Sequence, residues 1–152
     1  MVSSTKGEVS YIEQFSLNDC SIDECMNEGG GSMRVVFDNV QIARADIHLH
    51  ERHVKINKFG VEREYRGVGV GKMLMLRILD WCEKNNIFTA TVHASSGITE
   101  DMVKAGITRG LTQSQLENFY RSFGFVEQKE KWLLKDFGRK SLLIKPQSVF
   151  LN

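Results

Sequence analysis

The residue pattern best suited to chemistry is a turn with glycine at alternate positions, Gly67, Gly69 and Gly71, followed by Lys72. Glycine lets the backbone approach a ligand closely and adopt positive φ. If a helix begins here, its first N–H groups are unpaired and its dipole favours negative charge, so the turn would bind an anion. Two familiar phosphate motifs do not fit. A P-loop requires Ser or Thr where Met73 stands, and a dinucleotide turn requires a third glycine where Lys72 stands.

The elements that must position this turn follow from hydrophobic periodicity. Strict alternation over 42–50 predicts a half-buried strand, and apolar residues at helical spacing predict a helix from the turn to about residue 86. A second helix, 112–123, begins at Thr112 with Gln115 as its capping-box partner. The remaining expected strands are 33–37, 54–61, 87–94, 125–129, 132–137 and 141–145, with a helical turn at 99–105.

The strand before the glycine turn carries a defect in its pattern. Val54 and Ile56 share one parity along the chain, whereas Phe59 and Val61 share the other. Because side chains alternate with a period of two, one extra residue is needed to place all four on one face. A β-bulge near Asn57-Lys58 would supply it, and bulges are common beside active sites. A strand buried on both faces, or one that bends, explains the same parity.

The first 32 residues give weaker signals. Residues 11–15 suit a strand, and Ser21 followed by Glu24 is a capping-box pattern that predicts a short helix over 21–28. Three glycines, 29–31, then predict a flexible surface turn. A strand rather than a helix follows them, which disfavours a phosphate cradle.

Length and composition limit the class of protein. A chain of 152 residues predicts a single domain, 1–152. With 20 basic and 19 acidic residues the net charge is +1, which argues against a whole-surface nucleic-acid binder. Three cysteines without metal-like spacing predict free thiols in a reducing compartment. No apolar run reaches the ~18–20 residues that span a bilayer, so the sequence predicts a soluble, cytoplasmic protein.

Two stretches resemble one known family. Arg66–Gly71 fits the pattern Arg/Gln-x-x-Gly-x-Gly/Ala and resembles motif A of the GCN5-related N-acetyltransferases, the GNAT family. Tyr65–Gly71 differs from the usual Tyr-Arg-Gly-x-Gly-Ile-Gly core only by Val70. Residues 119–125, Phe-Tyr-Arg-Ser-Phe-Gly-Phe, resemble the family's helix ending Leu-Tyr-Glu-Lys-Leu-Gly-Phe. The second signature lies downstream of the first, where the family places it.

The resemblance spans about residues 33–125 and leaves 1–32 as an abbreviated N-terminal region. It implies an α+β (α/β three-layer) architecture, the acyl-CoA N-acyltransferase fold, with a mixed, mostly antiparallel, twisted sheet flanked by helices. It also implies acetyl-CoA as co-substrate and no metal. The pyrophosphate would lie on the turn, and the pantetheine arm would run in a splay between the strands at 54–61 and 87–94. The residues expected to bind acetyl-CoA are Phe59, Gly60, Val61, Arg66, Gly67, Val68, Gly69, Val70, Gly71 and Lys72.

The resemblance also implies a direct transfer of the acetyl group to an amine. Tyr120 matches the family's general-acid tyrosine, which supplies a proton to the departing thiolate. In the alternative interpretation, Tyr120 is only part of the apolar stripe with Leu116 and Phe119. A backbone N–H near the bulge would polarise the thioester carbonyl.

The general base is not identified by the resemblance. Many members place Glu on the strand before motif A, but the nearest position here is Asn57, which cannot act as a base. His53, Glu51 and His93 are candidates, because imidazole and carboxylate groups titrate in a useful range. A water relay is an alternative, and each of the three also fits an ordinary turn or strand position.

The acceptor is an amine of open identity: a protein or peptide lysine, an N-terminus, or a small-molecule amine. The N-terminal region has room for about one of the two helices that usually shape the acceptor pocket. The pocket would then be open, or completed by a second subunit in a homodimer. Gln113, where the family often has Asn, would loosen a pantetheine contact. The long segment 97–111 would be either a substrate-facing insertion or a passive loop.

Other classes of function remain to be weighed. Because the strand before motif A lacks the glutamate, an alternative is a CoA-binding domain that has lost catalysis and acts as a sensor or interaction module. His48 and His50 share a strand face near His53, but without a clear carboxylate or Cys partner a solvated strand explains them better than a metal site. Neither a nucleic acid nor a membrane is expected as a partner.

Overall fold

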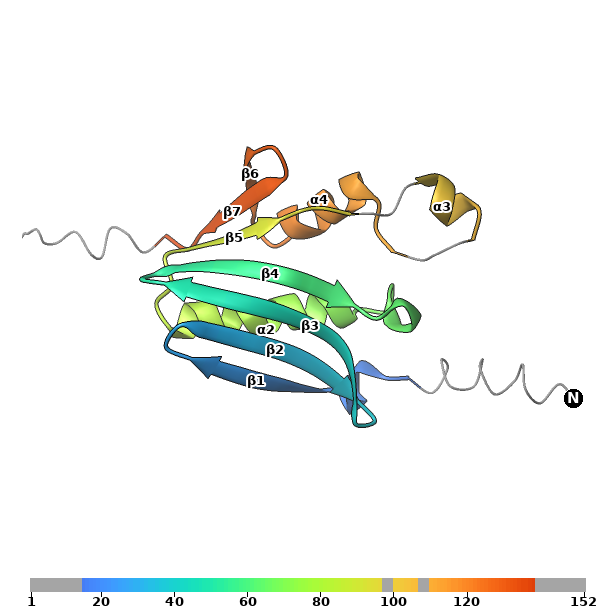
Figure 1. Ribbon diagram of the computed structural model, residues 1–152, viewed down its shortest axis with the longest axis horizontal. Coiled ribbons are helices and arrows are strands. Elements are labelled where there is room, and N and C mark those ends of the chain that lie inside the picture. Colours follow the sequence, from blue (N-terminus) through green and yellow to red (C-terminus); the bar gives the residue numbers. More distant parts are fainter. Residues whose placement is uncertain (1–14, 97–99, 107–109, 139–152) are drawn as a thin grey trace, which may run out of the picture.

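The computed structural model describes residues 15–96, 100–106 and 110–138. One seven-stranded sheet organises them, with the strand order β1-β2-β3-β4-β5-β7-β6 (Figure 1). The strands are β1 (Ser21–Asn27), β2 (Gly30–Phe37), β3 (Val40–His50), β4 (His53–Val61), β5 (Thr89–His93), β6 (Val126–Lys129) and β7 (Trp132–Asp136). The helices are α2 (Val70–Lys84), α3 (Glu100–Lys104) and α4 (Gln113–Arg121), with 3-10 turns η1 (Leu17–Asp19) and η2 (Arg63–Tyr65).

The sheet consists of two antiparallel groups joined by one short parallel pairing. Strands β1 to β4 form a meander, and β5, β7 and β6 form the second group. β4 pairs with β5 in parallel only from His53↔Thr89 to Ile56↔Val92. Because β4 continues to Val61, the two strands part beyond Ile56. The predicted α+β architecture with a mixed, mostly antiparallel sheet is confirmed, and the expected splay is present.

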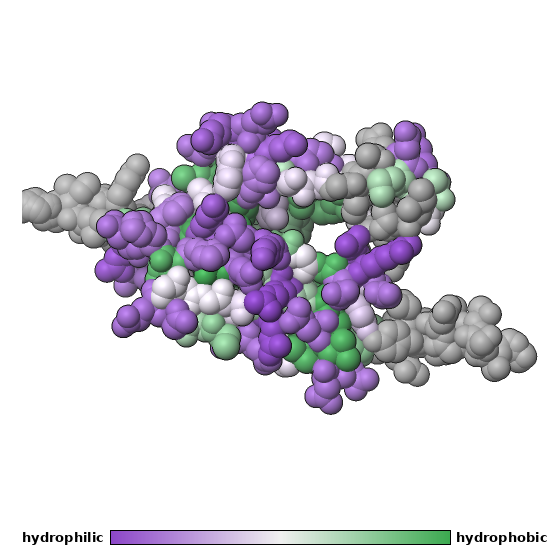
Figure 2. Space-filling view, viewed as in Figure 1, coloured by the Kyte–Doolittle hydropathy of each residue, from purple (hydrophilic) through white to green (hydrophobic). Residues whose placement is uncertain are grey.

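Helices α2 and α4 both lie behind the sheet in the view of Figure 1. Leu74, Met75 and Ile78 of α2 are fully buried in one cluster with strand residues such as Val35 and Ile47. The opposite face, called the front face below, carries the alternate side chains. Figure 2 shows that this face is largely hydrophilic. On β3 the front-face residues are Arg44, Asp46, His48 and His50, of which three are exposed and Asp46 is half-buried.

A β-bulge interrupts the pairing of β3 with β4 next to the splay. The register shifts between Asn57, which pairs with Asp46, and Gly60. Lys58 and Phe59 of β4 therefore lie opposite a single residue of β3, and Lys58 takes a φ of +53°. The bulge predicted from the sequence is confirmed, and the two alternative explanations of the parity are wrong.

The bulge restores the apolar side chains of β4 to the helix side of the sheet. Val54 and Ile56 are buried before it. After it, a Cβ on Gly71 of α2 would lie 3.6 Å from Val61 and 3.8 Å from Phe59. Without the extra residue, Phe59 and Val61 would point to the front face.

The positive φ of Lys58 leads to a stability prediction. A left-handed conformation costs an L residue roughly 1–2 kcal/mol, which glycine avoids, and a β-branched residue suffers most. We expect Lys58→Gly to leave the free energy of unfolding unchanged or raise it by up to about 1 kcal/mol, and Lys58→Val to lower it by roughly 1–2 kcal/mol. Urea unfolding measures both. Lys129→Val, in the exposed strand β6, is the matched control; equal effects of the two valine substitutions would contradict the strained bulge.

The N-terminal region corrects one prediction: Ser21–Asn27 is strand β1, not a helix. The capping-box pattern fails because pairing with β2 satisfies the backbone groups of this segment. Glu24, the expected capping partner, instead forms an ion pair with Arg77 of α2 at 3.0 Å. Of the strand expected over 11–15, only Phe15 is described, and its ring packs against Phe37.

The glycines at 29–31 form more than a flexible turn. Glu28 and Gly29 are the turn, whereas Gly30 and Gly31 begin β2 with positive φ. A Cβ on Gly30 would lie 2.0 Å from the carbonyl oxygen of Ile47, so β3 approaches too closely for another residue. The expected surface turn is a tight connection that joins β1 directly to β2.

The other predicted elements are present with small shifts of their ends. The helix after the glycine turn is α2, the expected helical turn is α3, and α4 begins with the predicted capping box at Thr112. The strand expected at 141–145 lies outside the described residues. Within the described ranges, no helix has the length and apolar character needed to cross a bilayer.

Candidate active site

The glycine turn leads directly into α2, and its backbone amides are unengaged. Gly69 is the N-cap residue with a φ of +97°, and Gly67 has a φ of +80°. The first helical hydrogen bond runs from Met73 N to Gly69 O at 3.0 Å. Among the described residues, no hydrogen bond engages the N–H groups from Gly67 to Lys72. These amides lie at the positive end of the helix dipole and can hold an anion.

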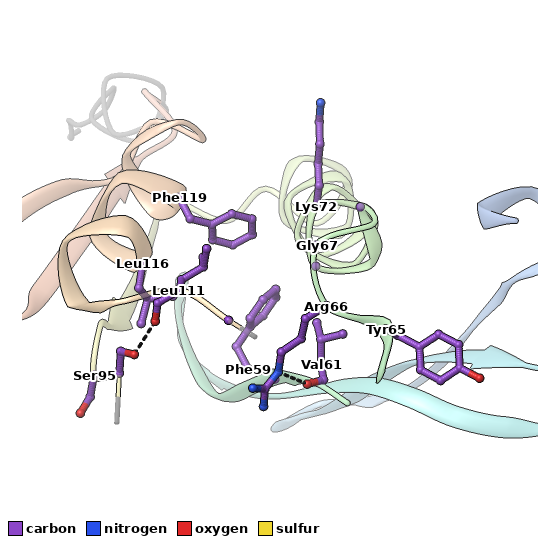
Figure 3. Close-up of a pocket in the computed structure, with 15 residues that line it drawn as sticks. Phe59, Val61, Tyr65, Arg66, Gly67, Lys72, Ser95, Leu111, Leu116 and Phe119 are labelled. Atoms are coloured by element: carbon purple, nitrogen blue, oxygen red, sulfur yellow. Dashed lines mark hydrogen bonds between the residues drawn. The ribbon is translucent and has the colours of Figure 1, made fainter. Parts of the chain in front are cut away.

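A cleft of about 700 Å³ lies where β4 and β5 part. In Figure 3, Phe59 from β4 and Phe119 from α4 both point into the space beside the glycine turn. Figure 2 shows the hollow between the segment that follows β4 and the segment around α3. The lining residues are Phe59, Gly60, Val61, Tyr65, Arg66, Gly67, Gly69, Gly71, Lys72, Ser95, Ser96, Gly110, Leu111, Leu116 and Phe119.

Most residues expected to bind acetyl-CoA lie around this cleft. The exceptions are two valines in the glycine turn. Val70 is 1% exposed and packs into the core, whereas Val68 is 38% exposed and does not line the cleft. The buried Val70 can therefore offer a ligand at the turn only its backbone N–H.

Two cations flank the glycine turn. Arg66 Nε donates a hydrogen bond to Val61 O at 3.0 Å, which ties the turn to the end of β4. Figure 3 shows Lys72 extending from the first turn of α2, away from the sheet. The ring of Tyr65 points away from the cleft and packs against Phe15 at 5.3 Å, so this residue anchors the turn to the core.

Sequence reasoning missed the far wall of the cleft, which the segment after β5 and helix α4 supply. Gln113 holds this wall together: its Nε2 donates to Ala94 O at 2.6 Å, and its Oε1 accepts from Ser96 N at 2.9 Å. The amide of Gln113 is therefore engaged at both ends. The only signal in the sequence was a polar residue directly after the N-cap of α4. The wall residues missed were Ser95, Ser96, Gly110, Leu111, Leu116 and Phe119.

The segment 97–111 reaches the cleft at its described end. Gly110 and Leu111 line the cleft, and Ser96 Oγ donates to Leu111 O at 2.5 Å. Both interpretations of the segment, substrate-facing insertion and passive loop, stay open.

Tyr120 lies behind the cleft wall on α4, with 3% exposure. Its ring is 6.1 Å from that of Phe59 and 5.5 Å from that of Phe119, both of which line the cleft. Burial raises the pKa of the Tyr120 hydroxyl to about 12. The hydroxyl has no hydrogen-bond partner among the described residues. Tyr120 thus belongs to the apolar stripe, and its hydroxyl stays protonated at neutral pH.

Two of the three base candidates lie far from the bulge. Glu51 is in the turn before β4, and His53 is the first residue of β4. Six residues of strand, roughly 20 Å, separate His53 from Phe59. The His53 ring nitrogens lie 2.6 Å from the hydroxyl of Thr89 and 3.2 Å from that of Thr91. Burial, and to a lesser extent the charge of His50, lowers the pKa of His53.

His93 is the one base candidate at the splay. It is the last residue of β5 and directly follows Val92, the last partner of β4. Its side chain is exposed, and its ring lies 4.7 Å from that of Trp132. The geometry therefore favours His93 over Glu51 and His53. In the described ranges, no group of three His, Cys, Asp or Glu residues is arranged to hold a metal ion.

A sheet whose parallel neighbours part at a bulge, with a turn of unengaged amides beside the opening, is the arrangement of the acyl-CoA N-acyltransferase fold. The family model described as "Acetyltransferase (GNAT) domain" matches residues 30–127, from the start of β2 into β6. The chain belongs to this family of acetyltransferases, as motif A indicated.

Solved structures share this fold. A GNAT family acetyltransferase from Elizabethkingia anophelis with acetyl-CoA bound has a TM-score of 0.57 at 8% identity, covering 79% of this chain and 99% of that chain. The ribosomal-protein-S18-alanine N-acetyltransferase from Escherichia coli has a TM-score of 0.52 at 16% identity, covering 88% of this chain and 87% of that chain. The PaiA N-acetyltransferase from Thermoplasma acidophilum, in complex with coenzyme A, has a TM-score of 0.51 at 14% identity; this chain spans 60% of its length, and 70% of this chain is covered. No curated protein matches the chain. At these identities the likeness shows the fold alone.

Proposed function

We propose that the protein transfers the acetyl group of acetyl-CoA directly to a primary amine of a protein, a peptide or a small molecule. The observation that carries this proposal is the row of unengaged amides at the start of α2, placed beside an apolar cleft. The amides, with Arg66 and Lys72, suit a pyrophosphate, and the cleft suits the pantetheine arm. Two structural relatives are described with CoA or acetyl-CoA bound, and one is an alanine N-acetyltransferase.

The proposed chemistry assigns a step to each part of the site. The amine nitrogen attacks the thioester carbonyl carbon, and the C–S bond breaks to give an amide and the CoA thiol. An unpaired backbone N–H at the bulge, beside Lys58 or Phe59, polarises the carbonyl oxygen. Tyr120 donates to the departing sulfur. An acceptor that binds as an ammonium must release a proton before it attacks, because an ordinary lysine has a pKa of ~10.4.

A thiol-release assay tests this function. The protein is incubated with acetyl-CoA and four separate amines: a peptide with an N-terminal alanine, an N-blocked lysine peptide, spermidine and an aminoglycoside. We expect at least one amine to accelerate CoA release above the rate without acceptor, and mass spectrometry to find that amine acetylated. Failure to bind acetyl-CoA would remove the proposal.

One observation favours a second candidate, a CoA-binding sensor without catalysis. Asn57 stands at the bulge where the family often carries glutamate, so the usual carboxylate base is missing from β4. Tight binding of acetyl-CoA without transfer to any of the four amines is the result that this candidate predicts.

A further inference from the structure

The front face at the splay carries polar side chains that the proposed chemistry has not used. The pairing register places Asp46 of β3 beside Asn57 of β4, the last residue before the bulge. Partners in antiparallel strands have Cα atoms ~4.5–5.5 Å apart, and their side chains stand on the same face. His93 is the residue after Val92 on β5, as Asn57 is the residue after Ile56 on β4, and Ile56 and Val92 are paired. These three side chains therefore form one row across the opening.

The front face is the side from which an amine can reach the bulge. Behind the sheet, Leu116 and Phe119 and the glycine turn surround the part of the cleft that suits the pantetheine arm. Gly60 lines the same cleft, and a Cβ on it would meet nothing within 4 Å. Because Gly60 pairs with Arg44, a front-face residue, that open space lies on the front side of the sheet.

Asp46 is the carboxylate best placed in this row. Its Oδ1 accepts a hydrogen bond from Arg44 Nε at 2.9 Å, and its side chain is 23% exposed. Arg44 thus holds one carboxylate oxygen of Asp46, while the carboxylate stays accessible to a ligand. Among the described front-face strand residues, the other carboxylates lie far from the splay: Asp23 on the edge strand β1, and Asp136 opposite Thr89 at the other end of β5.

The neighbours of Asp46 in the row suit the task less well. The amide of Asn57 cannot accept a proton from an ammonium. The ring of His93 lies tilted against that of Trp132 on β7, so it is on the opposite side of the opening from β3.

We propose that Asp46 is the carboxylate that binds the acceptor amine on the front face and accepts its proton. The inference rests on the proposed acetyl transfer and assigns its acceptor side. The ammonium passes one proton to Asp46 and from there to solvent. The nitrogen then forms the bond to the carbonyl carbon as the C–S bond breaks. The nitrogen's second proton ends on the departing CoA thiolate, which gives the amide and the CoA thiol. Arg44 orients Asp46 throughout.

The test compares Asp46→Asn with Asp23→Asn, a second Arg-paired carboxylate of the same face. The amine that the wild type acetylates fastest among the four named above is the probe. We expect Asp46→Asn to lower kcat/KM for this amine at least tenfold, with the dissociation constant of acetyl-CoA within twofold of wild type. Asp46→Glu should recover part of the loss, and Asp23→Asn should behave as wild type.

The outcomes separate this inference from the proposed function. A wild-type protein that acetylates the probe, with Asp46→Asn equally active, overturns the role of Asp46 and leaves the transferase function standing. Equal losses in Asp46→Asn and Asp23→Asn also overturn it, because they would reflect the charge of the whole face. A wild-type protein that binds acetyl-CoA but acetylates no amine overturns the transferase function, and the role of Asp46 with it.

Discussion

Substitution of Gly71 by leucine is expected to abolish acetyl-CoA binding while the protein stays folded. Gly71 lies in the first turn of α2, where its φ is not positive, so any residue fits the backbone. A Cβ there would lie 3.6 Å from the ring of Phe119 and 3.8 Å from that of Phe59, and the leucine side chain must extend between these two rings. It would occupy the space between β4 and α4 that the pantetheine arm requires.

We expect the affinity for acetyl-CoA to fall at least 100-fold, which corresponds to about 2.8 kcal/mol. Isothermal titration calorimetry measures this loss. The stability should not fall, because leucine is a better helix former than glycine by close to 1 kcal/mol. Gly71→Ala is the matched control: its Cβ makes ordinary contacts, so its affinity should stay within about fivefold of wild type. Wild-type affinity of Gly71→Leu would show that the cofactor binds elsewhere.

The central part of the fold could be predicted because its signals are local. The bulge follows from the parity of Val54 and Ile56 against Phe59 and Val61, a pattern that the sequence carries whatever the partner strands are. The glycine turn is equally local, since its function depends on backbone groups of consecutive residues. These two features locate one wall of the cleft and the end at which the unengaged backbone amides lie.

The opposite wall and the N-terminal strand could not be predicted, because they depend on partners distant in sequence. Ser21–Asn27 is a strand because β2 pairs with it, and nothing within the segment outweighs its capping-box pattern. Likewise, the sequence marks Gln113 only as a departure from the family's usual Asn, because its hydrogen bonds to Ala94 and Ser96 depend on the end of β5 lying beside it. Asp46 acquires its place only through the register with Asn57.

Substitution of Tyr120 by phenylalanine is expected to lower kcat by roughly 10²–10³-fold with little change in acetyl-CoA affinity. The pKa of about 12 makes the hydroxyl a weak acid, whereas an ordinary thiol has a pKa of ~8.5. Full proton transfer from Tyr120 to the thiolate would therefore be uphill by several kcal/mol. We expect the hydroxyl to stabilise the departing sulfur as a hydrogen-bond donor, so its loss should resemble the loss of one oxyanion-hole donor.

The high pKa also fixes the pH behaviour. Because burial raises the pKa of Tyr120, its donor form is present throughout the neutral and moderately alkaline range and is lost only as the pH approaches about 12. Deprotonation of Tyr120 should therefore cause no fall in wild-type kcat below about pH 11, and the 10²–10³-fold deficit of Tyr120→Phe should be constant from pH 6 to 9.

A second tyrosine provides the control. Tyr65→Phe removes a hydroxyl whose ring points away from the cleft, so it should leave kcat within about twofold of wild type (Figure 3). Steady-state kinetics with a fixed amine, together with calorimetric acetyl-CoA affinities, measures all three proteins. Unchanged turnover in Tyr120→Phe would reduce Tyr120 to a member of the apolar stripe that packs against Phe59 and Phe119, and the departing sulfur would then have to be stabilised by the backbone amides or by water.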